Sequence, residues 1–212
     1  MSIYTPRHFL NDDTAAITRV IDEFGFATLI TSVPGAETMV SHVPLLHEAR
    51  AATHGVLIGH VAAANPHAAM LTDGATSAVF HGPQAYVSPN WYEKTAASVP
   101  TWNYVVVHVH GQIERIDELD AKRDIVDQLS RRHEASFPKP WTIGKMEPAL
   151  LDRMLGAIVG FRMTIERIDA KFKLTQNRSA ADRAGVIEGL EARGSASERA
   201  LADWMRAYSS RD

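Results

Sequence analysis

Two histidines and one glutamate could share a face of an extended segment near the middle of the chain. His108, His110 and Glu114 lie in the stretch 103–116, whose alternating valines predict a β-strand. Side chains an even number of residues apart point to the same side of a strand. This spacing could therefore place two imidazoles and a carboxylate around one metal ion. No later histidine with matching spacing completes the set, so we favour hydrogen-bonded packing of these rings over a metal-dependent enzyme.

Aromatic rings alternate with amides and hydroxyls in short strings at the ends of the predicted strands. The strings cover residues 4–9, 59–67, 79–92, 99–104 and 171–178. Rings offer stacking surfaces, and amides can pair with the edge of a planar, heteroatom-rich ligand. Lys173 and Arg178 come just before Ser179, the predicted start of a helix, where a phosphate group would be well placed. The strings therefore predict a site for a planar ligand.

The composition excludes several classes of protein. The 212 residues include 22 Lys and Arg against 25 Asp and Glu, a net charge of −3, so no overall basic field favours binding to nucleic-acid phosphates. The absence of cysteine excludes disulfides, thiolate metal sites and cysteine nucleophiles. We find no signal peptide and no apolar run of the roughly 20 residues needed to span a bilayer. We therefore expect a cytoplasmic protein without membrane contact.

Six segments have strand composition and follow one another closely. They are residues 26–33, 39–46, 55–61, 75–82, 103–116 and 160–174. The turn residues Pro34-Gly35 predict a hairpin of the first two strands, and residues 82–102 are predicted to form a loop. Helices are predicted over residues 11–24, 118–132 and 147–155. Two more close the chain: Ser179 can begin the earlier one and Gly194 can end it, and Ser195 with Glu198 forms a capping box at the start of the later one. The first helix should end at Gly25 in a left-handed conformation.

Few of these strands are separated by a full helix. This order favours a mainly β protein with helices (β+α), built as an antiparallel barrel rather than a doubly wound parallel sheet. We expect a barrel domain over residues 1–175 and a helical C-terminal segment over residues 176–212.

Taken in order, the strings resemble the PaiB family, the FMN-binding negative transcriptional regulators. The most specific matches are Phe80-His-Gly-Pro with Tyr86-Val-Ser-Pro, Val99-Pro-Thr-Trp-Asn-Tyr, and Lys173-Leu-Thr-Gln-Asn. The resemblance covers essentially the whole chain. It implies a six-stranded antiparallel split β-barrel of the FMN-binding type, which forms a homodimer and holds FMN at the subunit interface.

The resemblance also implies seven cofactor-binding residues. They are His60, Asn65, Trp102, Asn103, Lys173, Gln176 and Asn177. The first two would lie near the FMN phosphate or ribityl chain, and the next two at the flavin ring. The last three would contribute from the C-terminal segment.

Two positions depart from the family pattern. Ala62-Ala63-Ala64 occupies the place of the phosphate-binding cation, and Ala68 stands where a tryptophan is common. Lys173, Arg178 or Lys94 could take over the phosphate.

The regulator function would require contact with DNA, directly or through a partner. The last two helices mix arginines with aspartates and glutamates. Such a mixture is more typical of a solvated face or a dimer surface than of a recognition helix. We therefore predict an FMN-binding protein of the PaiB type that acts as a negative transcriptional regulator. A flavin-dependent oxidoreductase of the same fold and the metal-dependent enzyme are the alternatives.

Overall fold

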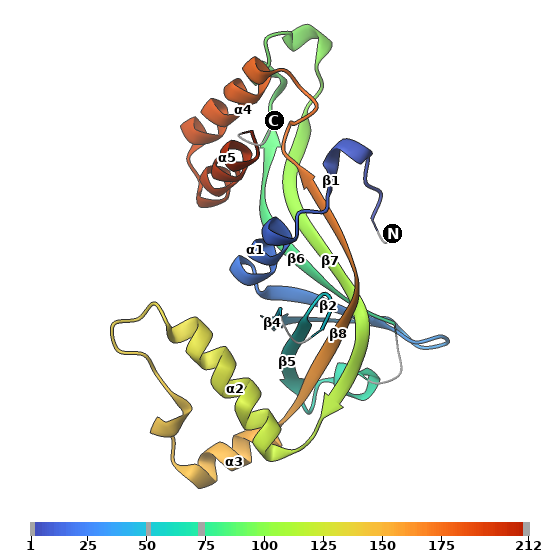
Figure 1. Ribbon diagram of the computed structural model, residues 1–212, viewed down its shortest axis with the longest axis vertical. Helices are drawn as coiled ribbons and strands as arrows, with labels where there is room; N and C mark the ends of the chain where they lie inside the picture. Colours follow the sequence, from blue (N-terminus) through green and yellow to red (C-terminus); the bar gives the residue numbers. More distant parts are fainter. Residues whose placement is uncertain (1–2, 50–51, 72–74, 210–212) are drawn as a thin grey trace. The chain divides into compact units, whose positions relative to one another are not determined.

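The chain forms an open antiparallel sheet of eight strands (Figure 1). The computed structural model describes residues 3–49, 52–71 and 75–209. The strands are β1 (Leu10–Asn11), β2 (Phe26–Ser32), β3 (Met39–Pro44), β4 (Leu46–Glu48), β5 (Val56–Ala62), β6 (Ala75–Val87), β7 (Thr101–Ile116) and β8 (Ile158–Lys173). Their order is β3-β2-β6-β7-β8-β5-β4, and β1 pairs with β8. The mainly β, antiparallel architecture is therefore confirmed.

All six predicted strands are present, and the count of six is too low. The two additional strands, β1 and β4, have two and three residues, too few to show an alternating pattern. The predicted loop over residues 82–102 is also shorter than expected. Strand β6 continues to Val87 and β7 begins at Thr101, and the connection contains the short helices η3 (Pro89–Trp91) and η4 (Thr95–Ala97).

Two compact units share the sheet. Unit 1 comprises Met1–Val20, His81–Val107 and Asp169–Asp212, and unit 2 comprises Ile21–Phe80 and His108–Ile168. The long strands β6, β7 and β8 have residues in both units. The division of the chain between residues 175 and 176 stays a prediction.

Unit 2 contains the predicted hairpin and a helix-covered part of the sheet. β2 pairs with β3 in antiparallel register, and Gly35 in the connecting turn has a φ of 82°. Helix α2 (Leu119–Glu134) packs Ile125 and Leu129 against Val56 and Ile58 of β5. Burying each such side chain contributes about 1.5–3 kcal/mol. Helix α3 (Pro148–Gly156) adds a second small cluster through Leu151 and Leu155.

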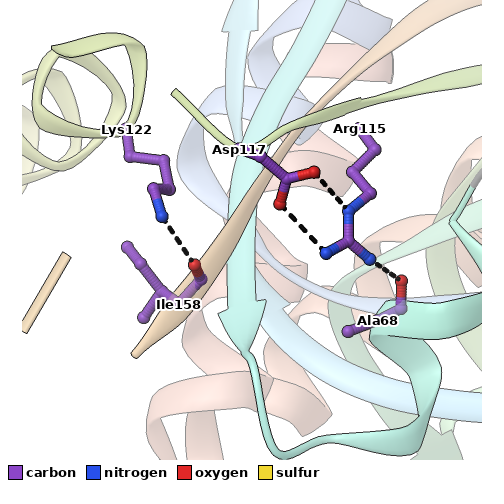
Figure 2. A network of polar contacts seen from close by, with 5 residues as sticks. All are labelled: Ala68, Arg115, Asp117, Lys122 and Ile158. Atoms are coloured by element: carbon purple, nitrogen blue, oxygen red, sulfur yellow. Dashed lines mark hydrogen bonds and ion pairs between the residues drawn. The ribbon is translucent and has the colours of Figure 1, made fainter. Parts of the chain in front are cut away.

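Polar contacts fix the ends of two strands in unit 2 (Figure 2). The buried Lys122 donates from Nζ to the carbonyl of Ile158, at the start of β8, over 3.1 Å. Arg115, near the end of β7, pairs with both carboxylate oxygens of Asp117 at 2.7 and 3.0 Å. Its Nη1 donates to the carbonyl of Ala68 in η2 (Pro66–Met70) over 3.0 Å, as Figure 2 shows. Arg115 therefore ties η2 to the end of β7.

Unit 1 contains the two C-terminal helices, with the ends that the sequence predicts. The Ser179 Oγ accepts the backbone N–H of Asp182 and begins α4 (Ala180–Arg193). Gly194, with a φ of 68°, ends it. Ser195 and Glu198 form the predicted capping box at the start of α5 (Ala196–Ser209), each accepting the other's backbone N–H.

Aromatic side chains join these helices to the sheet of unit 1. Phe172 of β8 packs edge-on against Trp204, with ring centroids 5.6 Å apart. Trp91 lies against α4, where a Cβ on Gly189 would come within 2.3 Å of the Trp91 ring. Only a glycine lets that ring approach the helix so closely. Helix α1 (Thr14–Glu23) begins at Asp13, whose Oδ1 accepts the N–H of Ala15 over 2.9 Å.

The predicted left-handed end of the first helix at Gly25 is wrong. Among the described glycines, only Gly35, Gly55 and Gly194 have a positive φ. Gly25 instead accepts the N–H of Leu45 over 2.8 Å, and a Cβ there would lie 3.0 Å from the Leu45 carbonyl oxygen. Close approach between two backbones explains this glycine. Within the described ranges, every helix is too short or too polar to span a lipid bilayer.

Candidate functional site

Unit 2 has a wide, uncharged pocket of about 500 Å³ between β3, β5 and the start of η2. It is lined by Val40, Ser41, His42, Val43, Pro44, His60, Val61, Ala62 and Asn65. The lining includes two of the predicted residues, His60 and Asn65, and contains no lysine, arginine or carboxylate. A volume of this size lies within the range of about 300–1,000 Å³ typical of organic-ligand sites.

A buried hydrogen-bond network holds Asn65 at the edge of this pocket. The Asn65 Oδ1 accepts the N–H of His67 and caps η2, and its Nδ2 donates to the Ser41 hydroxyl over 3.0 Å. The fully buried His67 ring contacts Ser41 through Nδ1 and Thr31 through Nε2, both over 2.9 Å. Burial lowers the pKa of His67 and favours the neutral ring, which suits one donor and one acceptor nitrogen. His67 therefore positions Asn65 rather than a ligand.

His60 lines the same pocket and has an unpaired nitrogen in its ring. Its Nδ1 is buried and has no hydrogen-bond partner among the described residues. Burial also lowers the pKa of His60, so the ring is held neutral. An unpaired buried nitrogen costs about 1–3 kcal/mol.

Unit 1 has a smaller, cationic pocket of about 140 Å³ at the start of β7 and the end of β8. It is lined by Phe9, Tyr92, Val99, Thr101, Asn103, Lys173, Thr175, Asn177 and Arg178. Three of the predicted residues, Asn103, Lys173 and Asn177, belong to this lining. The other polar groups of the lining are hydroxyls and the guanidinium of Arg178.

Lys173 and Arg178 supply the positive charge of this pocket. The Lys173 ammonium donates to the Thr101 hydroxyl and, over 2.6 Å, to the carbonyl of Trp102. Burial, and to a smaller extent the charge of Lys171, lowers the pKa of Lys173. The Arg178 guanidinium lies 4.7 Å from the centroid of the Tyr92 ring.

A strained turn forms the floor of the pocket. Thr175 has a φ of 65°, a left-handed conformation that β-branched residues rarely adopt. Its hydroxyl accepts from the Nδ2 of the buried Asn103 over 2.6 Å. The Gln176 side chain accepts the N–H of Leu174 over 2.7 Å and donates to the Phe172 carbonyl. Gln176 therefore stabilises the turn.

The seven predicted residues thus fall into three groups. His60 and Asn65 line the unit 2 pocket, while Asn103, Lys173 and Asn177 line the unit 1 pocket. Gln176 lies in the turn behind the unit 1 pocket, and Trp102 borders it with a side chain that is 53% exposed. Their role in cofactor binding stays a prediction.

Sequence reasoning did not select Ser41, Thr101 and Tyr92, which line the two pockets. Thr101 and Tyr92 belong to the aromatic strings and could have been chosen from them. Ser41 lies in an ordinary alternating strand, and only its contacts with Asn65 and His67 distinguish it.

The metal hypothesis finds no support in the geometry. Across residues 3–49, 52–71 and 75–209, no group of three or more histidine and carboxylate side chains is placed to hold a metal ion. The His110 Nδ1 is engaged by the Ser77 hydroxyl over 2.7 Å, and the His108 ring packs edge-on against that of His110. The His110 ring is therefore hydrogen-bonded within unit 2, and the choice between packing and a metal site stays a prediction.

Comparison with known proteins decides the family. Residues 3–167 match the family described as "Putative FMN-binding domain". The "Protease synthase and sporulation protein PAI 2" of Bacillus subtilis is 32% identical over 206 residues, covering 96% of both chains. The chain belongs to the PaiB family. An uncharacterized protein of Emericella nidulans is 28% identical over 201 residues, covering 78% of this chain and 80% of its own.

Solved structures confirm the split-barrel fold at much lower identity. A conserved hypothetical protein of Mycobacterium tuberculosis superposes with a TM-score of 0.58 at 15% identity, over 84% of this chain and 94% of its own. The FAD and heme binding protein of Mycobacterium smegmatis gives a TM-score of 0.56 at 14% identity, over 88% of this PaiB-family chain and 80% of its own.

Proposed function

We propose that this PaiB-family chain is an FMN-binding protein that works in the cytoplasm as a homodimer. The observation that carries the proposal is the match of residues 3–167 to an FMN-binding family, in a chain whose unit 2 holds a pocket of about 500 Å³. The FAD named for the Mycobacterium smegmatis protein of similar fold supports a flavin as the ligand.

The residues of the unit 2 pocket fit the uncharged part of a flavin. Val43, Pro44 and Val61 give apolar surface for a ring, and Asn65 with Ser41 gives hydrogen-bonding groups for ribityl hydroxyls or ring edges. The neutral ring of His60 also belongs to this lining, although its unpaired Nδ1 is buried. The same lining does not fit a phosphate, because no cation belongs to it.

A homodimer would explain why the predicted cofactor-binding residues fall into separate groups, because each subunit would contribute a different group to one flavin. In this proposal His60 and Asn65 of one subunit bind the flavin, while the exposed Trp102 is available for stacking from its partner. Bound FMN would supply any redox chemistry. The chain's own residues would orient the flavin, exclude water from it and hold its polar edge.

Titration of purified protein with FMN and with riboflavin, followed by flavin fluorescence, tests this proposal. We expect saturable binding at micromolar flavin, and at least a tenfold weaker affinity in His60→Ala. His54→Ala is the matched control, because this exposed histidine lines neither pocket. Absence of flavin binding at high micromolar concentration would refute the proposal. Light scattering should give twice the mass of the chain.

The family resemblance also implies a role for this flavin-binding protein as a negative transcriptional regulator. The arginines of α4 and α5 are engaged within unit 1: Arg193 pairs with Glu198 at 2.7 Å, and Arg206 pairs with Glu191 and Asp203. We therefore expect regulation without strong DNA contact from these helices. A gel shift with upstream DNA at low and physiological salt checks this, and specific binding that persists at physiological salt would contradict it.

A further inference from the structure

We propose that the unit 1 pocket binds a phosphate group through Lys173 and Arg178. This inference does not rest on flavin binding, because the pocket's charge and size support it by themselves. Its volume of about 140 Å³ corresponds to a few water molecules at about 30 Å³ each, which is room for a phosphate but not for a whole flavin.

The charges of the lining are unbalanced. The pocket is lined by two cations and no carboxylate. Among the described residues, Lys173 donates only to neutral oxygens, and Arg178 makes no ion pair. The nearby carboxylate of Asp182 accepts the backbone N–H of Glu93 over 3.0 Å. Two cations thus line one small pocket whose lining has no carboxylate, and a bound oxyanion could pair with both.

The lowered pKa of Lys173 is consistent with this geometry. Its ammonium is partly buried and lies near Lys171, and both effects disfavour the charged form. A bound anion would raise the pKa of Lys173, because a nearby negative charge favours the protonated ammonium. The phosphate would therefore interact with a fully protonated Lys173.

The strained turn supplies the rigidity that such a site needs. A left-handed threonine persists only where its surroundings hold it, and here Asn103, Gln176 and the backbone contact from Arg178 N–H to the Thr175 carbonyl do so. The turn leads directly to Arg178. The hydrogen-bonded turn therefore holds the backbone of Arg178, which lines the same pocket as Lys173.

Calorimetric titration of the full chain with inorganic phosphate tests the proposal. We expect binding in wild type, at least tenfold weaker binding in Arg178→Gln, and partial recovery in Arg178→Lys, which keeps the charge. Arg153→Gln is the matched control, because Arg153 is exposed on α3 and lines neither pocket. Thermal unfolding of each variant shows that it is folded. Equal phosphate affinity in wild type and Arg178→Gln, or no phosphate binding in wild type, would overturn the proposal.

Comparison of FMN with riboflavin identifies the source of the phosphate. If the pocket takes the phosphate of FMN, Arg178→Gln weakens FMN binding and leaves riboflavin binding unchanged. If it takes a separate phosphate compound, the variant loses inorganic phosphate but binds both flavins as wild type does. Phosphate binding without any flavin binding would refute the proposed function and leave this inference intact.

Discussion

The two pockets of the chain differ in charge and in the way their polar groups are held. The unit 2 pocket is wide and neutral, with His60 and Asn65 beside apolar side chains. The unit 1 pocket is narrow and carries Lys173 and Arg178. Asn65 is fixed by a network of uncharged hydrogen bonds, whereas Arg178 follows a strained turn.

This difference suits the two pockets to different ligand groups. A neutral, partly apolar wall suits a ring and a ribityl chain, and a pair of cations suits a phosphate. The alanines at residues 62–64 leave the unit 2 pocket without a cation. Positive charge lines the unit 1 pocket instead, through Lys173 and Arg178.

The strongest test of the neutral pocket removes its buried support. His67→Ala leaves a cavity and deprives the hydroxyls of Ser41 and Thr31 of a partner. We expect a loss of about 3 kcal/mol in the free energy of unfolding, measured with urea. The exposed His54→Ala should change it by less than about 0.5 kcal/mol. Equal stability of the two variants would show that the network does not support the pocket.

The cationic pocket is tested by dissecting the turn at Thr175. Thr175→Ala loses the hydroxyl that accepts from Asn103 but keeps a Cβ in the left-handed conformation. Thr175→Gly loses the hydroxyl as well but removes the strain. We expect the glycine variant to be about 1 kcal/mol more stable than the alanine variant in urea unfolding. An alanine variant as stable as the glycine variant would show that the left-handed conformation at residue 175 costs no stability.

A smaller effect should appear as pH dependence in unit 2. Burial lowers the pKa of His60 below its ordinary value of 6.5, so the unfolded chain binds a proton more readily than the folded chain. Stability from this group is complete above pH 6.5 and falls as the pH drops toward the lower folded value. His60→Gln should therefore lose less stability than wild type between about pH 7 and 5. If the urea midpoints of wild type and His60→Gln change equally with pH across this range, the lowered pKa of His60 is contradicted.

Local signals in the sequence predicted much of the fold. Strand composition, with clear alternation over residues 103–116, placed the six longer strands, and the Ser195 and Glu198 pattern identified the start of the last helix. These features depend on neighbours within a few residues. Strands β1 and β4 were missed because they exist only through pairing with β8 and β5. Gly25 was misread because a distant backbone, at Leu45, explains it.

The seven predicted residues were given as one set, and the structure divides them among two pockets and a turn. The aromatic strings include Asn103 and Lys173, which line one pocket, and His60 and Asn65, which line the other. Sequence spacing could not show that Gln176 bonds to the backbone of its own turn. It also could not show that His67 is fully buried and bonded on both sides.

The sequence by itself determined the longer strands, the ends of the last two helices and the PaiB family. Each of these depends on residue types and their order along the chain: strand composition, capping residues and ordered motifs. Only the tertiary structure decided which polar groups share a pocket and which serve the backbone. The physical reason is that burial, charge balance and hydrogen-bond pairing depend on residues far apart in the chain, such as Asn103 with Thr175 and His67 with Thr31.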